Sequence, residues 1–242
     1  MAILEISGVT KRFGGLTAVD NVTFSVEANE IFGLIGPNGA GKTTLLSCLA
    51  GDLRPNGGTV RLDGRDTTGL PADRMCRLGV GRTFQIPRPF PHMSVFDNVV
   101  VAAAFGDPKI QRDQVARRAL DMIEYVEFPR PVTTLASHLN AAQLKRLDLA
   151  RALASGPRLL LLDELAAGLT PGELTSIATL LRRIRGDGVT IVMVEHVMRL
   201  IMELCDRLSV LHYGELIAHG DAATVARDDL VREAYLGQSY IL

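Results

Sequence analysis

The sequence predicts an α/β fold in which a largely parallel sheet is covered by helices on both faces. Three observations support this prediction. Short aliphatic runs, which favour buried strands, alternate with segments of helical pattern. The first of these runs ends in a glycine-rich turn. The chain of 242 residues is also long enough for one sizeable domain with a buried core.

The N-terminal part is expected to contain three strands and a helix. Ala2–Val9 alternates between apolar and polar residues as a strand does, and Ile31–Ile35 is a buried strand that runs into the glycine-rich turn. A helix should follow over Lys42–Ala50 and end at Gly51. Thr59–Leu62 is a further strand, because an Asp-Gly turn follows it directly.

The middle of the chain, residues 89–155, is predicted to be a helical lobe inserted between two parts of the core, residues 1–88 and 156–242. A strand-like stretch, Leu78–Gln85, leads to three prolines within Pro87–Pro91, which exclude both a helix and a central strand. Beyond this connector, helices are expected over residues 95–105, 111–126 and 141–154.

Strands and helices alternate again after Pro157. Leu159–Leu162 is a continuous aliphatic run that predicts a buried strand. Thr170 is a good N-cap for a helix that begins at Pro171, because Glu173 stands three residues beyond the cap. The remaining expected strands are Val189–Val194, Arg207–Leu211 and Leu216–Ala218, with a helix between the first two.

Composition and charge restrict the possible functions. Lys and Arg number 26 against 27 Asp and Glu, a balance that disfavours bulk binding of nucleic acid. Cys48, Cys76 and Cys205 are scattered, which is typical of neither a disulfide framework nor a zinc site. The longest apolar run, Val99–Phe105, is far shorter than the roughly 20 residues of a membrane span. Without a signal-peptide pattern at its start, the sequence predicts a cytosolic protein that works at a membrane only if a partner holds it there.

The strongest chemical motif is the phosphate-binding loop pattern, formed by Gly36, Pro37, Asn38, Gly39, Ala40, Gly41, Lys42 and Thr43. Glycines let backbone N–H groups approach phosphate closely, and the N-terminus of the following helix adds partial positive charge. Lys42 can reach the β- and γ-phosphates, and the Thr43 hydroxyl can bind Mg²⁺. We expect these residues and Thr44 to bind the triphosphate. A glycine-rich turn with a chance lysine is the alternative, which the strand–loop–helix context disfavours.

Two acidic residues follow the aliphatic strand of residues 159–162. Parallel sheets bind ligands at the carboxyl ends of their strands, where Asp163 and Glu164 stand. Asp163 would help to hold Mg²⁺, directly or through water, and Glu164 would be the general base for an attacking water. Gln85 and His196 also stand at predicted strand ends. A lone histidine is more often structural, but its position at the same sheet edge favours a functional role for His196.

Together these motifs resemble the nucleotide-binding subunits of ABC transporters over essentially the whole chain. The resemblance implies a single ATP-binding domain over residues 1–242, with a P-loop NTPase core, an N-terminal antiparallel β subdomain and an inserted α-helical subdomain. It implies that Phe13 stacks on adenine, that Gln85 reaches Mg²⁺ and the attacking water, and that His196 contacts the γ-phosphate. Lys42 would offset charge on that phosphate. The alternative for Phe13 is an aromatic residue packed in the core.

The sequence departs from the family at its signature, Leu-Ser-Gly-Gly-Gln, which corresponds to Leu139–Gln143. The serine is replaced by Asn140 and the second glycine by Ala142. In the family, this segment, including Gln143, binds the γ-phosphate of ATP held by the other subunit. Asn140 can still donate a hydrogen bond and cap the helix, but the Ala142 methyl would crowd a backbone that must approach phosphate.

From this departure we hypothesise that the chain weakens its partner's ATP site and keeps its own, which fits a heterodimer with an unlike ATPase better than a homodimer. A tolerated or introduced substitution is the alternative. A second departure lies beyond the acidic pair, with Leu165 where proline is common and Thr170 where aspartate is often found. Helix capping is sufficient to explain Thr170.

Several segments resemble the branched-chain amino acid uptake branch of the family, namely Arg82–Gln85, Phe90, Met93–Val99 and Val231–Gly237. This resemblance implies an importer ATPase for branched-chain or other amino acids and related small solutes, cytoplasmic and peripheral on the inner face of the cell membrane. The implied partners are membrane permeases, a second ATP-binding subunit and, indirectly, an external solute-binding protein, with no nucleic acid. Exposed groups around Gln85–Met93 should accept a coupling helix of a permease.

Three other classes of function stay open at this point. The first is a soluble ABC ATPase of translation, DNA repair or cluster assembly. The second is an export ATPase. The third is a non-hydrolytic subunit that only completes a partner's site, although Gln85, Asp163, Glu164 and His196 disfavour it.

Overall fold

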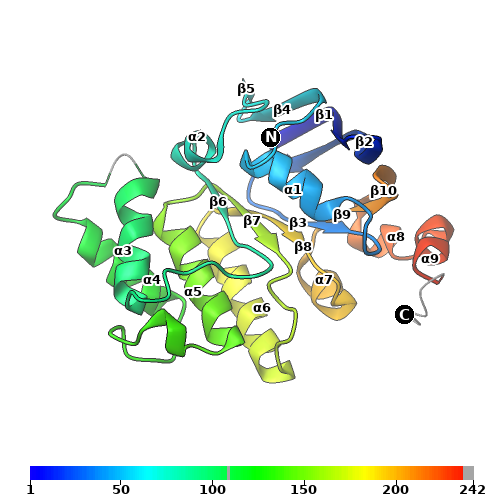
Figure 1. Cartoon of the computed structure of the whole chain (residues 1–242). Helices are drawn as coiled ribbons and strands as arrows, with labels where there is room; N and C mark the ends of the chain where they lie inside the picture. The colour runs from blue at the N-terminus through cyan, green and yellow to red at the C-terminus, as the bar shows by residue number, and fades with distance from the viewer. Residues whose placement is uncertain (108–109, 237–242) are drawn as a thin grey trace.

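The computed structural model describes residues 1–107 and 110–236, and this part of the chain contains two sheets (Figure 1). The antiparallel sheet has the order β2-β1-β4-β5, with β1 Ala2–Phe13, β2 Leu16–Glu27, β4 Gly57–Leu62 and β5 Arg65–Asp66. The second sheet has the order β10-β9-β3-β8-β7-β6, with β3 Ile31–Ile35, β6 Val80–Arg82, β7 Leu159–Asp163, β8 Thr190–Val194, β9 Arg207–His212 and β10 Glu215–Asp221. Its neighbouring strands are parallel except β9 and β10, so the α/β prediction is confirmed.

Helices separate most of the parallel strands. They are α1 Lys42–Ala50, α2 Ala72–Arg77, α3 Val95–Gly106, α4 Val115–Tyr125, α5 Ala141–Ala154, α6 Pro171–Gly186, α7 Met198–Leu204, α8 Ala222–Val225 and α9 Asp229–Leu236, with a 3₁₀ turn at Ala136–His138. Helices α3, α4 and α5 lie between β6 and β7 in the chain and pack on one another away from the antiparallel sheet (Figure 1).

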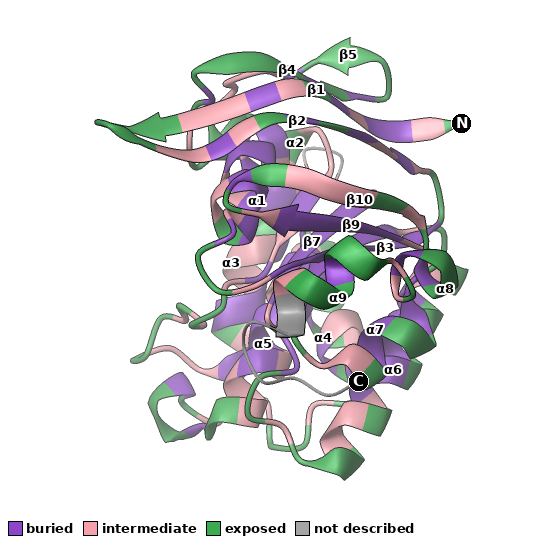
Figure 2. Ribbon diagram, turned by 90° about the vertical axis from the view of Figure 1, so that its right-hand side faces the viewer, coloured by how far each residue is buried: buried purple, intermediate pink, exposed green. Residues whose placement is uncertain are grey.

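Strand side chains alternate between two apolar cores, one on each face of the parallel sheet. Leu34 and Leu161 join the core that contains α1 and the antiparallel sheet. Ile35 and Leu160 join the core that contains α5, α6 and α7. This alternation follows from the two-residue repeat of a strand, and both faces are covered (Figure 2). The carboxyl ends of the strands are thereby held rigidly at one edge.

Some elements differ from the sequence expectation. β1 continues to Phe13 and pairs with β2, which was not expected from the residues themselves. The strand expected over Leu78–Gln85 is only Val80–Arg82, because Leu78 caps α2 and Gly79 has a φ of +89°. Gln85 therefore stands three residues beyond the strand rather than at its end. Residue 237 of the C-terminal segment lies outside the described residues.

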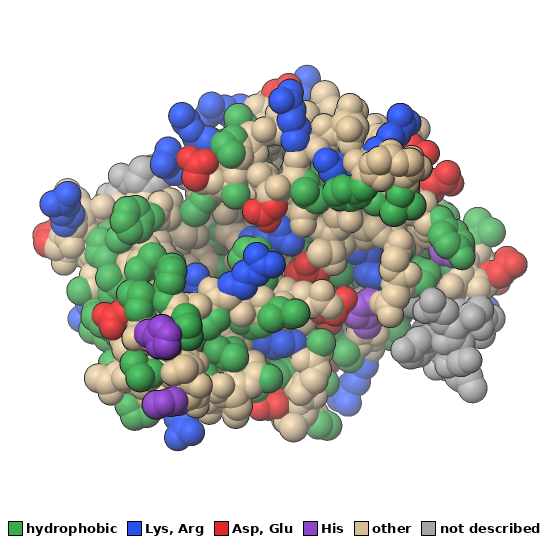
Figure 3. Space-filling view, in the orientation of Figure 1, with side chains coloured by type: hydrophobic (Ala, Val, Ile, Leu, Met, Phe, Trp, Pro, Cys, Tyr) green, Lys and Arg blue, Asp and Glu red, His purple; other side chains and the backbone are tan. Residues whose placement is uncertain are grey.

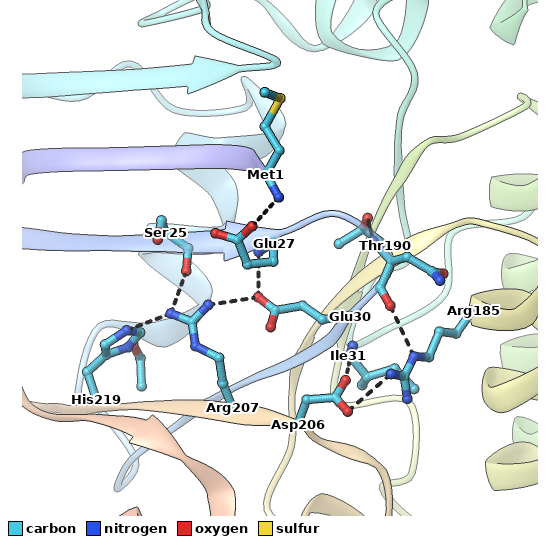
Figure 4. A network of polar contacts seen from close by, with 12 residues as sticks. Met1, Ser25, Glu27, Glu30, Ile31, Arg185, Thr190, Asp206, Arg207 and His219 are labelled. Atoms are coloured by element: carbon cyan, nitrogen blue, oxygen red, sulfur yellow. Dashed lines mark hydrogen bonds and ion pairs between the residues drawn. The ribbon is translucent and has the colours of Figure 1, made fainter.

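A polar network fixes the end of β3 that lies opposite the glycine-rich turn (Figure 4). Arg207 on β9 forms an ion pair with Glu30 and donates hydrogen bonds to the Ser25 carbonyl and to His219. Asp206 accepts from the Ile31 amide over 2.9 Å. The network joins both sheets at the entry of β3, so the strand that leads into the turn is anchored at its start.

Local capping agrees with the sequence prediction for α6. Thr170 accepts from the Glu173 amide and the Glu173 carboxylate accepts from the Thr170 amide, with Pro171 in the first turn.

Among the helices of the described residues, none combines the length and the apolar character that a membrane span requires.

Candidate active site

The glycine-rich turn links β3 to α1 and depends on glycine at two positions. Gly36 has a φ of +148°, and a Cβ there would lie 2.1 Å from the Leu211 carbonyl oxygen. Gly41 has a φ of +98°, and a Cβ there would lie 2.2 Å from the Ala18 carbonyl oxygen. Other residues would clash with backbone at both places. The glycines therefore let the turn pack against neighbouring strands and remain wrapped around its centre.

The N-terminus of α1 suits an anion. Gly41 is its N-cap, and within the described residues no side chain caps the helix and no acidic residue stands in its first turn. The first backbone N–H groups of a helix have no partner in the helix itself, and the helix dipole favours negative charge there. Thr43 is exposed and Thr44 half-buried in this turn. A phosphate group fits this position.

Lys42 points its ammonium group into the turn. Nζ donates to the carbonyl oxygens of Gly36 at 2.7 Å and Pro37 at 2.8 Å, and the residue is 5% exposed. Burial lowers the pKa of Lys42, and the carboxylates of Glu164 and Asp163 oppose that shift. The arrangement places a cation at the centre of the loop, where phosphate oxygens would replace the two carbonyls.

Asp163 ends β7 next to α1. Its Oδ1 accepts a hydrogen bond from the Thr43 hydroxyl at 3.2 Å, and its Oδ2 lies 3.5 Å from the Arg82 guanidinium. Burial raises the pKa of Asp163, while Arg82 and Thr43 oppose the shift. Hydroxyl and carboxylate oxygens are the ligands that Mg²⁺ prefers, so the pair of Thr43 and Asp163 fits this ion. No cluster of three or more His, Cys, Asp or Glu side chains suited to a metal occurs among residues 1–107 and 110–236.

Glu164 is held at both carboxylate oxygens. Gln85 Nε2 donates to Oε2 at 2.7 Å, and His196 Nε2 shares a hydrogen bond with Oε1. The Glu164 side chain is 14% exposed and that of His196 38% exposed, so both reach solvent. These three residues come from the loops after β6, β7 and β8. The structure brings Gln85 and His196 to the Glu164 carboxylate, so His196 lies at the sheet edge that its sequence position predicted, while Gln85 reaches it from beyond the end of β6.

The backbone of Glu164 is unusual because its φ is +49°. A residue with a Cβ adopts this left-handed region at a cost, and surrounding contacts must hold it there. The Glu164 amide donates to the Val194 carbonyl at 2.9 Å. This backbone turn directs the carboxylate away from the strand and toward Gln85 and His196.

Three further residues of this region were not identified by sequence reasoning. Arg82 contacts Asp163 and also pairs with Asp52. Lys145 on α5 donates to the carbonyls of the loop that follows β7. Glu195 accepts from the amide of Ala166 in the same loop. The position of Glu195, next to His196 and directly after a strand, is a sequence signal that could have identified it as a site residue. Nothing in the sequence distinguishes Lys145 from a surface lysine.

Phe13 and the signature segment are further residues that the sequence assigned to the site. Phe13 is 46% exposed at the end of β1, with Lys11 Nζ 5.1 Å from its ring centroid, so it is not a core residue. Asn140 is the N-cap of α5 and forms a capping box with Gln143, as its capping role predicted. Within the described residues, no hydrogen bond joins this segment to the loop at Lys42. Ala141, at the first signature glycine, also carries a methyl group.

Charged side chains surround the site on one face of the molecule. Figure 3 shows acidic, basic and histidine side chains gathered near the centre of this face, between the antiparallel sheet and the helices. The site contains a cation in the loop, a hydrogen-bonded carboxylate beside it and a pair of oxygens suited to a metal ion. Phosphoryl transfer to water requires these groups.

Two family models match the sequence. One, described as ABC transporter, matches residues 19–167. The other, described as Branched-chain amino acid ATP-binding cassette transporter, matches residues 215–241. Together they extend from the antiparallel sheet to the C-terminal region.

Curated relatives match over nearly the whole chain. The high-affinity branched-chain amino acid transport ATP-binding protein BraF of Pseudomonas aeruginosa is 38% identical, with 98% of each chain covered. The corresponding protein LivG of Escherichia coli is 37% identical with the same coverage. The lipopolysaccharide export system ATP-binding protein LptB of Escherichia coli is 31% identical, with 100% of each chain covered.

Solved structures of ATP-binding cassettes match this fold over nearly the whole chain. A nucleotide-free ATP-binding cassette from an ABC transporter has a TM-score of 0.90 at 29% identity, covering 98% of this chain and 100% of that one. An ATP-binding cassette in its ADP conformation has a TM-score of 0.88 at 28% identity, with the same coverage.

Proposed function

The chain belongs to the ABC transporter family of ATP-binding proteins, and we propose that it is the ATP-hydrolysing subunit of an importer for branched-chain or other amino acids. The observation that supports this proposal most directly is the pairing of Lys42, inside the phosphate-suited loop, with Glu164, held by Gln85 and His196. Phosphoryl transfer needs both a charge-offsetting cation and a positioned water.

ATP binds with its phosphates in the loop of residues 36–43. Backbone N–H groups of the loop and the N-terminus of α1 donate to phosphate oxygens, and Lys42 exchanges its two carbonyl partners for the β- and γ-phosphates. Thr44, in the first turn of α1, adds its side chain to the groups that bind the triphosphate. Phe13 is exposed enough for its ring to stack on adenine.

Thr43, Asp163 and Gln85 would hold Mg²⁺ next to the phosphates, directly or through water. When bound, this ion neutralises charge that develops on the phosphate oxygens.

Hydrolysis uses the carboxylate of Glu164. It accepts a proton from water as the water attacks the γ-phosphate in line, and ADP leaves. Gln85 and His196 fix the orientation of this carboxylate, since each contacts a different oxygen. His196 is exposed enough to contact the γ-phosphate as well.

A second ATP-binding subunit completes the site. In the family pattern, the signature segment at Asn140, Ala142 and Gln143 faces the ATP of the opposite cassette. Both Ala141 and Ala142 carry a methyl where the pattern has glycine, whereas the cap of α5 uses only the Asn140 side-chain oxygen and leaves its Nδ2 able to donate. The chain therefore supports ATP turnover in its partner poorly, and an unlike second cassette with its own intact signature is the partner that fits.

A membrane permease docks beside the helical lobe. A hollow of about 520 Å³ lies between the core and α3, and its lining includes Arg82, Phe84, Phe105 and Arg151. Phe105 is 80% exposed, and hydrophobic side chains gather over the α3 side in Figure 3. Ile86, in the segment expected to receive a coupling helix, is 78% exposed. This contact places the chain on the inner face of the membrane, with the external binding protein reached only through the permease.

The transported solute is proposed from the relatives. BraF and LivG are named for branched-chain amino acid transport, and the family model for that branch matches the C-terminal region. LptB, named for lipopolysaccharide export, is less similar but matches over the full length, so export is the second candidate.

Uptake of radiolabelled leucine, isoleucine and valine by cells that lack this chain tests the proposal. Re-expression of the wild type should restore uptake, and Glu164→Gln should restore neither uptake nor ATP hydrolysis, with a loss of about 100-fold or more in turnover because the general base is removed. The Glu164→Gln chain should still bind ATP. Unchanged uptake in cells without the chain would contradict the assigned solutes, and near-normal turnover of the variant would contradict the role of Glu164.

A further inference from the structure

We infer that Lys145 is a positioning residue for Glu164, and that it links the helix that starts at the signature to the loop that carries the catalytic carboxylate. The inference rests on the proposed function. Lys145 Nζ donates to the Glu164 carbonyl at 2.9 Å and to the Ala167 carbonyl at 2.6 Å. The residue is 8% exposed, so its ammonium group lies under this loop rather than in solvent.

Glu195 holds the same loop at a second point, the Ala166 amide. Its Oε1 accepts from the Ala166 amide at 2.7 Å, and the residue is 1% exposed. The segment Glu164–Ala167 is therefore fixed by a cation from α5, by a carboxyl group that follows β8, and by the bond from its first amide to Val194. Leu165 and Ala166 between the anchor points are buried, so packing limits the loop as well.

The strained backbone of Glu164 explains why the loop needs these anchors. Its φ of +49° is unfavourable for a residue with a Cβ, and such conformations persist only where the surroundings over-determine them. If the Glu164 peptide relaxed, the carboxylate would turn away from Gln85 and His196. Lys145 bonds to the carbonyl of that very residue, and hence restrains the dihedral that aims the carboxylate.

The same contact connects two functional regions. Helix α5 has Asn140 as its N-cap, and Lys145 stands within its first two turns. A helix segment of this length moves as a rigid element, so a displacement of the signature by the partner's nucleotide reaches the Glu164 carbonyl through the Lys145 side chain. This chain's own hydrolysis would then depend on whether the partner's ATP is seated.

Arg146 provides a matched comparison. It is the next residue on α5 and also donates to main-chain carbonyls, those of Val126 and Glu127, and to the Ser176 hydroxyl. These contacts reach the end of α4 and helix α6 and do not involve the loop at Glu164. Removal of Arg146 thus perturbs the same helix without breaking the proposed link.

The test measures steady-state ATP hydrolysis by the full chain in its assembled transporter, for the wild type, Lys145→Met, Lys145→Arg and Arg146→Met. If the second cassette is unlike this one, the assay uses a variant of that cassette in which glutamine replaces its catalytic glutamate. The measured turnover then reports on this chain. We expect Lys145→Met to lower kcat at least tenfold with KM within about twofold, Lys145→Arg to regain most of kcat, and Arg146→Met to keep kcat within about twofold.

Two results would overturn the inference: a Lys145→Met kcat within twofold of the wild type, or an equal loss of kcat in Arg146→Met. If thermal unfolding shows that Lys145→Met does not fold, Lys145→Gln replaces it, and an unchanged kcat then has the same meaning. Glu164→Gln in the same assay separates the two proposals. Normal turnover of Glu164→Gln removes the proposed role of Glu164, whereas an inactive Glu164→Gln beside a normal Lys145→Met removes only the role of Lys145.

Discussion

Glu195 is the residue whose titration should be visible near neutral pH. Burial raises its pKa to about 7, and hydrogen bonds from the Ala166 and His196 amides, with the nearby Lys145 ammonium, only partly oppose this shift. In the unfolded chain the group loses its proton near pH 4.5. The folded chain therefore binds one more proton between about pH 4.5 and 7, and its stability falls as the pH rises through this window.

Glu195→Gln should remove this pH dependence, because glutamine resembles the protonated acid and still accepts from Ala166. The variant should equal the wild type in stability near pH 4.5 and exceed it above pH 7, by no more than about 3 kcal/mol. Urea unfolding at several pH values measures the difference. A gap that stays constant from pH 5 to 8 would show that Glu195 does not titrate in this range.

At the residue scale, the sequence predicted the groups that have a recognisable spacing. The loop with Lys42 and the acidic pair after a strand are local patterns, which a sequence displays without its structure. Gln85 and His196 were identified because each follows a strand. Lys145 was missed because its function depends on a contact between α5 and a loop about twenty residues away, which no local pattern encodes.

The start of α5 shows how one segment can favour its own fold over binding. The Asn140 and Gln143 capping box satisfies the first amides of the helix, and alanine is the best helix former. Glycine at these positions would weaken the helix but leave room for phosphate. We therefore expect the departure from the family signature to favour the helix at the expense of the partner's ATP site.

Replacing Asn140 by Ser and Ala142 by Gly should raise ATP turnover of the assembled complex. The double variant should also lose stability by about 1 kcal/mol, because glycine costs roughly this amount in a helix and serine caps about as well as asparagine. Ala116→Gly is the matched control, since Ala116 is exposed in the first turn of α4. It should lose similar stability with no gain in turnover. Unchanged turnover in the double variant would argue against a weakened signature.

Elements were predicted well where capping residues and aliphatic runs agree. The start of α6 at Thr170 and Pro171 and the end of α1 at Gly51 follow such signals. The second strand, Leu16–Glu27, and the short helix Ala72–Arg77 were not expected from the residues, because their stability comes from pairing with β1 and from packing rather than from local preference. Tertiary contacts overrode weak local signals in both.

At the scale of the whole molecule, the parallel sheet brings distant segments to one edge. Lys42, Glu164 and His196 come from three different strand–helix connections, and the two cores on either face keep these connections in register. The network at Arg207 anchors the opposite end of β3 (Figure 4). Sequence order alone predicted the alternation of strands and helices, but the strand order and the pairing of β9 with β3 required the structure.

The central claim is that the loop at Lys42 binds the triphosphate of ATP, and calorimetric titration of the full chain with ATP and magnesium tests it most directly. The wild type should bind, and Lys42→Ala should bind at least about tenfold more weakly, because a charge-assisted contact to phosphate is lost. Arg117→Ala, at an exposed position on α4, should bind like the wild type. Absence of binding by the wild type, or equal affinity of Lys42→Ala, would contradict the account.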